Sequence, residues 1–341
     1  MSEPATPCYP LEHTELCSAT PTIGLRRMRR VILFVVVLLV TLLLPGCRSI
    51  RPVEKIGLLA PFEGLYRRTG YAALDAMRTA LSVAPQDTVD RLPLALDIAR
   101  NSERTAHKLL ADKNVRAVIG PLSLEAASAV EEVLADSPIL WLAPFAIDAN
   151  GSFVPVDQTE RWVKPWLSAV VALARQQGHN RLVVAGWPGR WSQLALEVDG
   201  ANPPFIVLSD DPLAVEPTDV VLHVGEPATV ARYLQTLRAH QPHVPLYLGP
   251  QGEDPVLREH SEIMGGVYWM AWVDDGYETW TTAHGVESPL RYLVYRATMT
   301  AIGAANGESP EADLRIQWYA YDETGHWRAV AAPGAAPAAQ P

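Results

Sequence analysis

The sequence predicts an α/β protein in which two doubly wound parallel sheets form two lobes joined by a hinge. Two observations support this fold class. Short apolar runs that end at glycine or proline alternate with longer amphipathic segments from about residue 53 to residue 330, which is the pattern of β-α units around a parallel sheet. The series also runs twice, with a break near residue 150, and two runs of this length indicate two sheets.

The first series begins at residue 55. The expected strands are short apolar runs at residues 55–60, 92–98, 115–119 and 139–142. The helices between them are recognised by apolar residues that share one face and by polar residues that can cap a first turn. They are expected over residues 70–83, from Asn101 or Ser102 to Lys113, and directly after Ser123.

The second series follows the break near residue 150. Its expected strands are residues 181–185, 204–208, 219–224, 244–248 and 266–272, with helices at 161–177, about 190–198, 227–239 and 288–306. Pro227 suits the first turn of its helix, because proline lacks a donor that this turn does not need. Residues 315–321 and 326–330 are expected to form a hairpin.

Composition and charge exclude several functional classes. The 341 residues are 48% hydrophobic and carry a formal net charge of −10. This apolar fraction is too high for a largely disordered chain, and the acidic balance argues against nucleic acid as a partner, because phosphate binding needs a basic face. No repeat of about 20–50 residues is visible, so a solenoid or propeller is not expected.

The chain lacks the common catalytic motifs, namely G-x-S-x-G, H-E-x-x-H, a Walker loop and G-x-G-x-x-G. His240 and His243 lie in a proline-containing loop, where surface histidines are a better interpretation than a metal site. No nucleophile, base and orienting group assemble in the pattern. We therefore expect no enzymatic activity, no metal and no cofactor.

The N-terminal segment has the composition of a signal peptide. Residues 26–30 are basic apart from one methionine, residues 31–45 carry no charge, and Gly46 and Cys47 follow. This order is typical of a secretory signal, and the apolar run is short for a bilayer span, which needs about 20 residues. Most of the chain is therefore expected outside the cytoplasm.

Leu44-Pro45-Gly46-Cys47 resembles the lipobox of bacterial lipoprotein signal peptides. The resemblance implies that residues 1–46 are removed, that a lipid is attached to Cys47, and that residues 47–52 link this anchor to the folded part. The alternative is an uncleaved N-terminal membrane anchor. At the other end, residues 331–341 are almost entirely Ala, Pro and Gly and are expected to be a disordered tail.

Several segments occur in the order and spacing of one known family. They are residues 56–61 with Gly64, 117–123, 141–146, 219–222, 248–250 and 266–268. Together they resemble type I periplasmic binding proteins, in particular the branched-chain amino-acid-binding and receptor-ligand-binding group. The resemblance implies a monomer with lobe 1 at 53–148 plus 275–313 and lobe 2 at 152–272 plus 314–330, which hinge shut on a ligand between them.

Loops after the strands are the candidate ligand contacts, because ligands of open α/β sheets bind at the carboxyl ends of the strands. Ser123, at a helix start, can hold a carboxylate or act as a plain cap. Trp187 and Trp191 can face a sugar, an aromatic ring or a cation, or can pack against a neighbouring helix. The candidate ligand-binding residues are Phe62, Glu63, Ser123, Ala143, Phe145, Ala146, Trp187, Trp191 and Gln251.

Two positions depart from related amino-acid binders. Ile147 stands where the resemblance implies a threonine, and Gln251 stands where it often implies an acid that holds an ammonium group. A neutral amide gives up most of that charge-assisted bond. Glu253 and Asp254 can substitute, or can be solvated loop acids. The departures argue against a standard zwitterionic amino acid, and Phe62 and Phe145 can narrow the cleft.

Two functions remain open. The first is a lipid-anchored, extracytoplasmic solute-binding protein that hands a small polar or amphipathic ligand to an ABC permease. The second is a non-transport envelope scaffold, or a regulator of a cell-wall synthase, that uses the same fold with a degenerate or filled cleft.

Overall fold

The computed structural model describes residues 32–36, 51–85, 89–200, 204–307, 313–322 and 324–331. The chain divides into two units, Met1–Arg51 and Pro52–Pro341. In the first unit, residues 32–36 are helical. The remainder of the expected signal peptide, Cys47, most of the linker and the tail from residue 332 lie outside the described residues. No helix in the described part of the chain is both long and apolar enough to cross a membrane.

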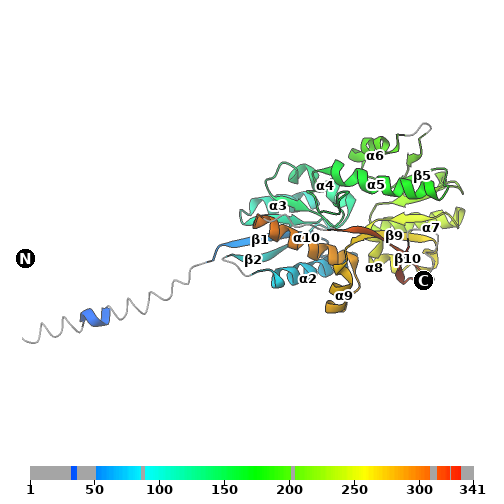
Figure 1. Cartoon of the computed structure of the whole chain (residues 1–341). Helices are drawn as coiled ribbons and strands as arrows, with labels where there is room; N and C mark the ends of the chain where they lie inside the picture. Colours follow the sequence, from blue (N-terminus) through cyan, green and yellow to red (C-terminus); the bar gives the residue numbers. More distant parts are fainter. Residues whose placement is uncertain are drawn as a thin grey trace, which may run out of the picture. The chain divides into compact units, whose positions relative to one another are not determined.

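A four-stranded parallel sheet forms the first half of the unit Pro52–Pro341 (Figure 1). Its strand order is β2-β1-β3-β4. The strands are β1 (Val53–Ala60), β2 (Asp90–Asp97), β3 (Val115–Ile119) and β4 (Leu140–Leu142). The helices that pack on it are α2 (Arg67–Val83), α3 (Ser102–Ala111), α4 (Leu124–Leu134) and α10 (Pro289–Ala305). We call this sheet with its four helices lobe 1.

The side chains of β1 are apolar on both faces of the strand, and helices therefore cover both faces of the lobe 1 sheet. Ile56 and Leu58 are buried with α2 and α10 in one core cluster. Leu59 is buried with α3 and α4 in another. Successive strand residues point to opposite faces, so a continuous apolar run needs cover on both sides, as the sequence predicts.

A seven-stranded sheet forms the second half, in the order β11-β10-β9-β8-β7-β5-β6. Its strands are β5 (Leu182–Ala185), β6 (Ile206–Leu208), β7 (Val220–His223), β8 (Leu246–Leu248), β9 (Val267–Val273), β10 (Arg315–Tyr321) and β11 (Trp327–Val330). Its helices are α5 (Thr159–Gln176), α6 (Ser192–Asp199), α7 (Pro227–His240) and α8 (Pro255–Arg258). We call this sheet with these helices lobe 2.

The lobe 2 sheet is parallel from β6 to β9, but β10 and β11 are antiparallel additions at its edge. The sequence predicts the β10–β11 hairpin but not its place in the sheet. Between β9 and β10 the chain runs through α9 and α10, and it then returns from lobe 1 to form β10 antiparallel to β9. Helix α9 (Gly276–His284), between β9 and α10, is not predicted by the sequence at all.

The chain passes from lobe 1 to lobe 2 after β4, returns after β9, and passes again before β10. Gly151 lies where the first and third of these crossings meet, and its carbonyl accepts a hydrogen bond from the Leu314 amide at 3.1 Å. The φ of Gly151 is +75°, and a Cβ on this residue would lie only 2.3 Å from the Leu314 carbonyl oxygen, so the position requires glycine. The two lobes thus share a tightly packed hinge.

Candidate functional site

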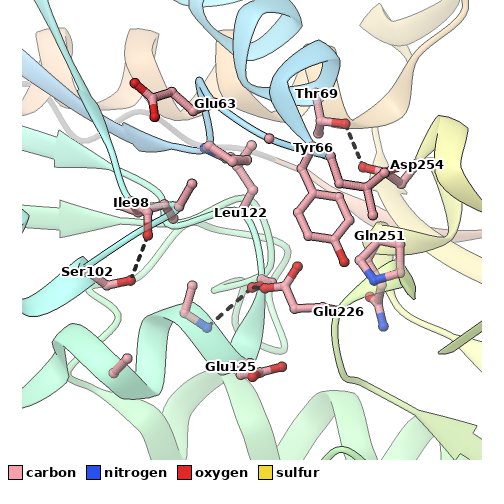
Figure 2. Close-up of a pocket in the computed structure, with 18 of the residues that line it drawn as sticks. Glu63, Tyr66, Thr69, Ile98, Ser102, Leu122, Glu125, Glu226, Gln251 and Asp254 are labelled. Atoms are coloured by element: carbon pink, nitrogen blue, oxygen red, sulfur yellow. Dashed lines mark hydrogen bonds between the residues drawn. The ribbon is translucent and has the colours of Figure 1, made fainter. Parts of the chain in front are cut away.

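A cavity of about 400 Å³ lies between the two lobes. Lobe 1 contributes the loops after β1, β2 and β3 together with the start of α4, and lobe 2 contributes the loops after β7 and β8. These are the carboxyl ends of the parallel strands, where ligands of open α/β sheets bind. Figure 2 shows residues of both lobes that face this interlobe cavity.

The cavity wall is mainly apolar, with Leu65, Ile98, Leu122 and Leu290 among its lining residues. Its charged groups are all carboxylates. They are Glu63, Glu125, Glu226 and Asp254. Among the described residues that line this cavity, none is a lysine or an arginine. The wall therefore offers apolar area and negative charge together.

The loop after β1 is held by a single carboxylate. Oδ1 of Asp97, the last residue of β2, accepts hydrogen bonds from the amides of Phe62 at 2.6 Å and Glu63 at 3.3 Å. The Glu63 side chain is exposed and pairs with the exposed Arg100 at 2.9 Å. Glu63 thus stands at the rim, where water screens its charge.

Three hydrogen bonds join the lobes across the cavity. The Ser123 hydroxyl donates to Glu226 Oε1 at 2.5 Å, and the Thr69 hydroxyl donates to Asp254 Oδ2 at 2.6 Å. The Tyr66 hydroxyl accepts from the Ala228 amide at 3.1 Å. In Figure 2 the Thr69–Asp254 bond closes one side of the cavity, with Tyr66 beside it. These contacts place the protein's own polar groups where the two lobes meet.

For two of these carboxylates, the loss of contact with water disfavours the charged form. Burial raises the pKa of Glu226, the Ser123 hydrogen bond opposes this shift, and the charges of Glu125 and Asp254 raise the pKa further. Burial also raises the pKa of Asp254, although the Thr69 hydroxyl and the Val256 amide stabilise its charged form. A positive charge in the cavity would relieve both penalties.

A third acidic contact lies next to the cavity. Glu253 Oε2 accepts a hydrogen bond from the Leu290 amide, in the first turn of α10, at 2.8 Å. Burial raises the pKa of this carboxyl to about 7. Glu253 and Asp254 are therefore structural links between lobe 2 and helices of lobe 1, not the solvated loop acids that were one expectation.

The pH dependence of stability should reveal two opposing buried groups. Burial lowers the pKa of His223 from 6.5 to about 4, so below pH 6.5 the unfolded chain binds a proton that the folded one refuses, and stability falls as the pH drops towards 4. Glu253 acts in the opposite sense, because its folded pKa of about 7 exceeds its ordinary 4.5. Its contribution is full below pH 4.5 and is lost as the pH rises through 7.

The variant Glu253→Gln should remove only the second effect. Its melting temperature should fall more steeply than that of the wild type between pH 7 and pH 4.5, because Glu253 then no longer opposes the His223 loss. The raised pKa values of Glu226 and Asp254 still oppose part of that loss in both proteins. That loss is on the order of 3 kcal/mol for a shift of this size. Differential scanning calorimetry at half-unit pH steps measures both proteins. Parallel curves for the two would contradict this assignment.

Three of the sequence-predicted site residues line the interlobe cavity: Glu63, Ser123 and Gln251. Ser123 caps α4 as expected, with its oxygen accepting from the Ala126 amide at 3.3 Å. The Gln251 amide group donates to the His223 carbonyl at 2.9 Å, so it is partly engaged within lobe 2.

The other predicted residues lie away from the wall of this cavity. Ala143 and Ala146 are fully buried in the core, because the loop after β4 turns inward. Phe62 packs edge-on against Tyr71, with ring centroids 5.5 Å apart. Phe145 lies beside a second, much smaller cavity of about 10 Å³, which Ser123 and Gln251 also line.

The two predicted tryptophans belong to an aromatic cluster. Trp191 is buried edge-on against Trp162 at 5.3 Å, and Trp187 stacks on Trp166 at 6.0 Å with the rings 5° apart. Phe145 contacts the same Trp162 at 5.3 Å. Since Trp162 and Trp166 lie on α5, this cluster corresponds to the packing alternative that the sequence leaves open.

Sequence reasoning missed Tyr66, Thr69 and Glu226. The signal for Glu226 was available, because it lies two residues after the expected strand 219–224, and the carboxyl-end rule applies to that strand as to the others. Tyr66 and Thr69 have no such signal, since they lie at the start of a helix whose orientation depends on the whole lobe.

Comparisons with known proteins show the fold. No protein-family model matches the sequence, and no curated protein matches it either. Similar solved structures include a possible leucine/isoleucine/valine-binding protein from Rhodopirellula baltica, at 10% identity and TM-score 0.62 over 83% of this chain and 98% of that one. The leucine-binding protein LivK from Thermotoga maritima gives 14% identity and TM-score 0.62 over 82% and 98%.

An ABC transporter substrate-binding protein from Desulfitobacterium hafniense, solved in complex with leucine, gives 12% identity and TM-score 0.56 over 82% of this chain and 100% of that one. Identities this low show architecture alone. The β-α units of both sheets, which are parallel except for β10 and β11, agree with that architecture. This chain therefore has the fold of the type I periplasmic binding proteins.

Proposed function

We propose that this protein is an extracytoplasmic solute-binding protein whose interlobe cavity takes a small amphipathic ligand with a positively charged end. The observation that carries the proposal is the cavity of about 400 Å³ lined from both lobes. Its size lies within the range of about 300–1,000 Å³ for small-molecule sites. Its apolar wall suits a hydrocarbon body, and its carboxylates suit an ammonium or guanidinium group.

A standard amino acid fits this cavity poorly. An amino acid carries a carboxylate beside its ammonium group. The charged side chains among the described residues that line the cavity are all acidic and would repel that carboxylate. Ser123, for which the sequence allows either carboxylate binding or a plain helix cap, donates its hydroxyl proton to Glu226. The ligands that the similar structures are named for therefore do not transfer directly to this chain.

The proposed cellular location and transport role are supported by the sequence and by the fold. The lipobox-like segment supports a lipid anchor at Cys47 on the outer side of a membrane, and one of the similar structures is described as an ABC transporter substrate-binding protein. Delivery of the ligand to an ABC permease by a monomeric, non-enzymatic protein is thus the first candidate role. Nucleic acid is not a proposed partner.

A ligand panel tests the proposal by thermal shift. The panel holds amines such as 3-methylbutylamine, polyamines, amino acids, sugars and nucleosides. A ligand at about a hundred times its dissociation constant adds about 2.7 kcal/mol to the stability of the folded state. For a protein of this size we expect the melting temperature to rise by roughly 4–5 °C with amines and by much less with amino acids.

The cross-lobe hydrogen bonds of Ser123, Thr69 and Tyr66 favour a second candidate, an envelope scaffold or regulator in which the protein's own side chains hold the lobes together. In that case no member of the panel raises the melting temperature. A rise with sugars or nucleosides alone would also contradict the first candidate, because these ligands carry no positive charge for the acidic wall.

A further inference from the structure

We propose that Glu226 is a specificity-determining residue: its carboxylate occupies the anion-binding position at the start of α4 and excludes ligands that carry a carboxylate of their own. This inference rests on the proposed function, because it names which small molecules the same cavity accepts and rejects. The ligand class it assigns is an organic amine or guanidine that lacks a carboxylate.

The start of α4 has the parts of an anion site. The first turn of a helix presents unpaired amide groups and the positive end of the helix dipole, and Ser123 adds a hydroxyl. A serine hydroxyl has one proton to donate, and here that proton goes to Glu226 Oε1 at 2.5 Å. The Ser123 Oγ in turn accepts from the Ala126 amide at 3.3 Å. The one proton that Ser123 can donate is thus taken, and a carboxylate from lobe 2 already holds the position.

The local structure of α7 explains why Glu226 reaches across the cavity. Glu226 is the N-cap residue of α7, yet its side chain makes no capping hydrogen bond to its own helix. The Ala228 amide near the start of that helix is satisfied instead by the Tyr66 hydroxyl of lobe 1. Each lobe therefore supplies a polar partner for the start of a helix in the other, and the Glu226 carboxylate is released to contact Ser123.

Charge adds to the steric exclusion. Glu125, in the first turn of α4, and Asp254, on the lobe 2 side, line the same cavity as Glu226. A ligand carboxylate near Ser123 would meet all three negative groups in a partly dehydrated space, where like charges repel strongly. An ammonium group in the same place would be attracted by all three.

Three probes that share an isobutyl group separate these effects: 3-methylbutylamine, 3-methylbutanoate and leucine. Their dissociation constants are measured by calorimetry at pH 7.5 for the wild type and for Glu226→Ser. Serine is a preferred N-cap residue, so this exchange preserves the start of α7 while it withdraws the carboxylate. Glu226→Asn, a second good N-cap, gives the same test if the serine variant does not melt cooperatively.

Two further variants serve as matched controls. Glu226→Gln removes the charge but leaves an amide oxygen that can accept from Ser123. Glu125→Gln removes one negative charge from the same cavity without touching the Ser123–Glu226 contact. Neither should open the anion position, so neither should admit 3-methylbutanoate.

The expected result is that Glu226→Ser binds 3-methylbutanoate at least tenfold more tightly than the wild type, and binds 3-methylbutylamine less tightly. The proposal is overturned if Glu226→Ser binds 3-methylbutanoate no more tightly than the wild type does. It is also overturned if Glu125→Gln gains as much affinity for 3-methylbutanoate as Glu226→Ser does. A wild type that binds none of the three probes counts against the proposed amine function for ligands with an isobutyl group. The gain of 3-methylbutanoate binding in Glu226→Ser would still support the role of Glu226.

Discussion

Replacing Trp141 with alanine should lower the free energy of unfolding by about 3–5 kcal/mol, the range for deleting a large buried aromatic side chain. Trp141 is 2% exposed and lies in β4, the edge strand of the lobe 1 sheet, where its side chain belongs to a hydrophobic core cluster. Its indole N–H donates to the Gly120 carbonyl at 2.6 Å. The exchange therefore leaves a cavity and also a buried carbonyl without its partner. Urea denaturation of the two proteins measures the difference.

The variant Trp141→Phe separates packing from hydrogen bonding. Phenylalanine keeps much of the buried volume but cannot donate to Gly120, so its cost should be smaller, about 1–3 kcal/mol. Because Leu122 and Ser123 follow Gly120 and line the interlobe cavity, both variants should also weaken ligand-dependent stabilisation. A loss below about 1 kcal/mol for the alanine variant, well under the usual range, would show that Trp141 does not support this loop.

Replacing Gly70 with alanine should destabilise the protein by about 1–3 kcal/mol, the usual cost of overpacking. Helix propensity alone predicts the opposite, because alanine is favoured over glycine by about 1 kcal/mol inside a helix. Sterics decide the outcome here. A Cβ at Gly70 would lie 1.8 Å from the Pro61 carbonyl oxygen, which belongs to the backbone and cannot rotate away.

The clash at Gly70 also bears on the site. Pro61, Tyr66 and Thr69 line the interlobe cavity, so a helix α2 pushed away from the loop after β1 would disturb its wall. Gly189→Ala is the matched control, since a Cβ there meets nothing within 4 Å. Its melting temperature should stay within about 1 °C of the wild type or rise slightly. An equal loss in both variants would refute the steric argument.

The sheets and most helices were predictable because their signals are local. The continuous apolar run in β1 indicates that both faces of this strand are covered. Ser123 indicates a helix start directly after it. The edge strand β10 was harder, because the antiparallel pairing of Arg315 with Val273 depends on where the third crossing returns. Nothing in residues 315–321 specifies that partner.

The site was predictable only in part. Glu63, Ser123 and Gln251 follow from the strand-end rule, but their partners are far away in the chain. Ser123 and Glu226 are 103 residues apart, and Thr69 and Asp254 are 185 apart. Such pairs depend on how two lobes are placed against each other. For the same reason the sequence could not decide whether Trp187 and Trp191 face a ligand or pack against α5.

The most direct test of the account is whether a side chain that fills the interlobe cavity abolishes ligand binding. Ala129 is exposed on α4 and lines the cavity, whereas Ala135 is exposed at the end of the same helix and does not. Calorimetric titration with 3-methylbutylamine should show binding to the wild type and to Ala135→Phe, and none to Ala129→Phe. Equal binding to all three proteins would contradict the claim that the space between the lobes is the working site, and binding to none would contradict the proposed amine function.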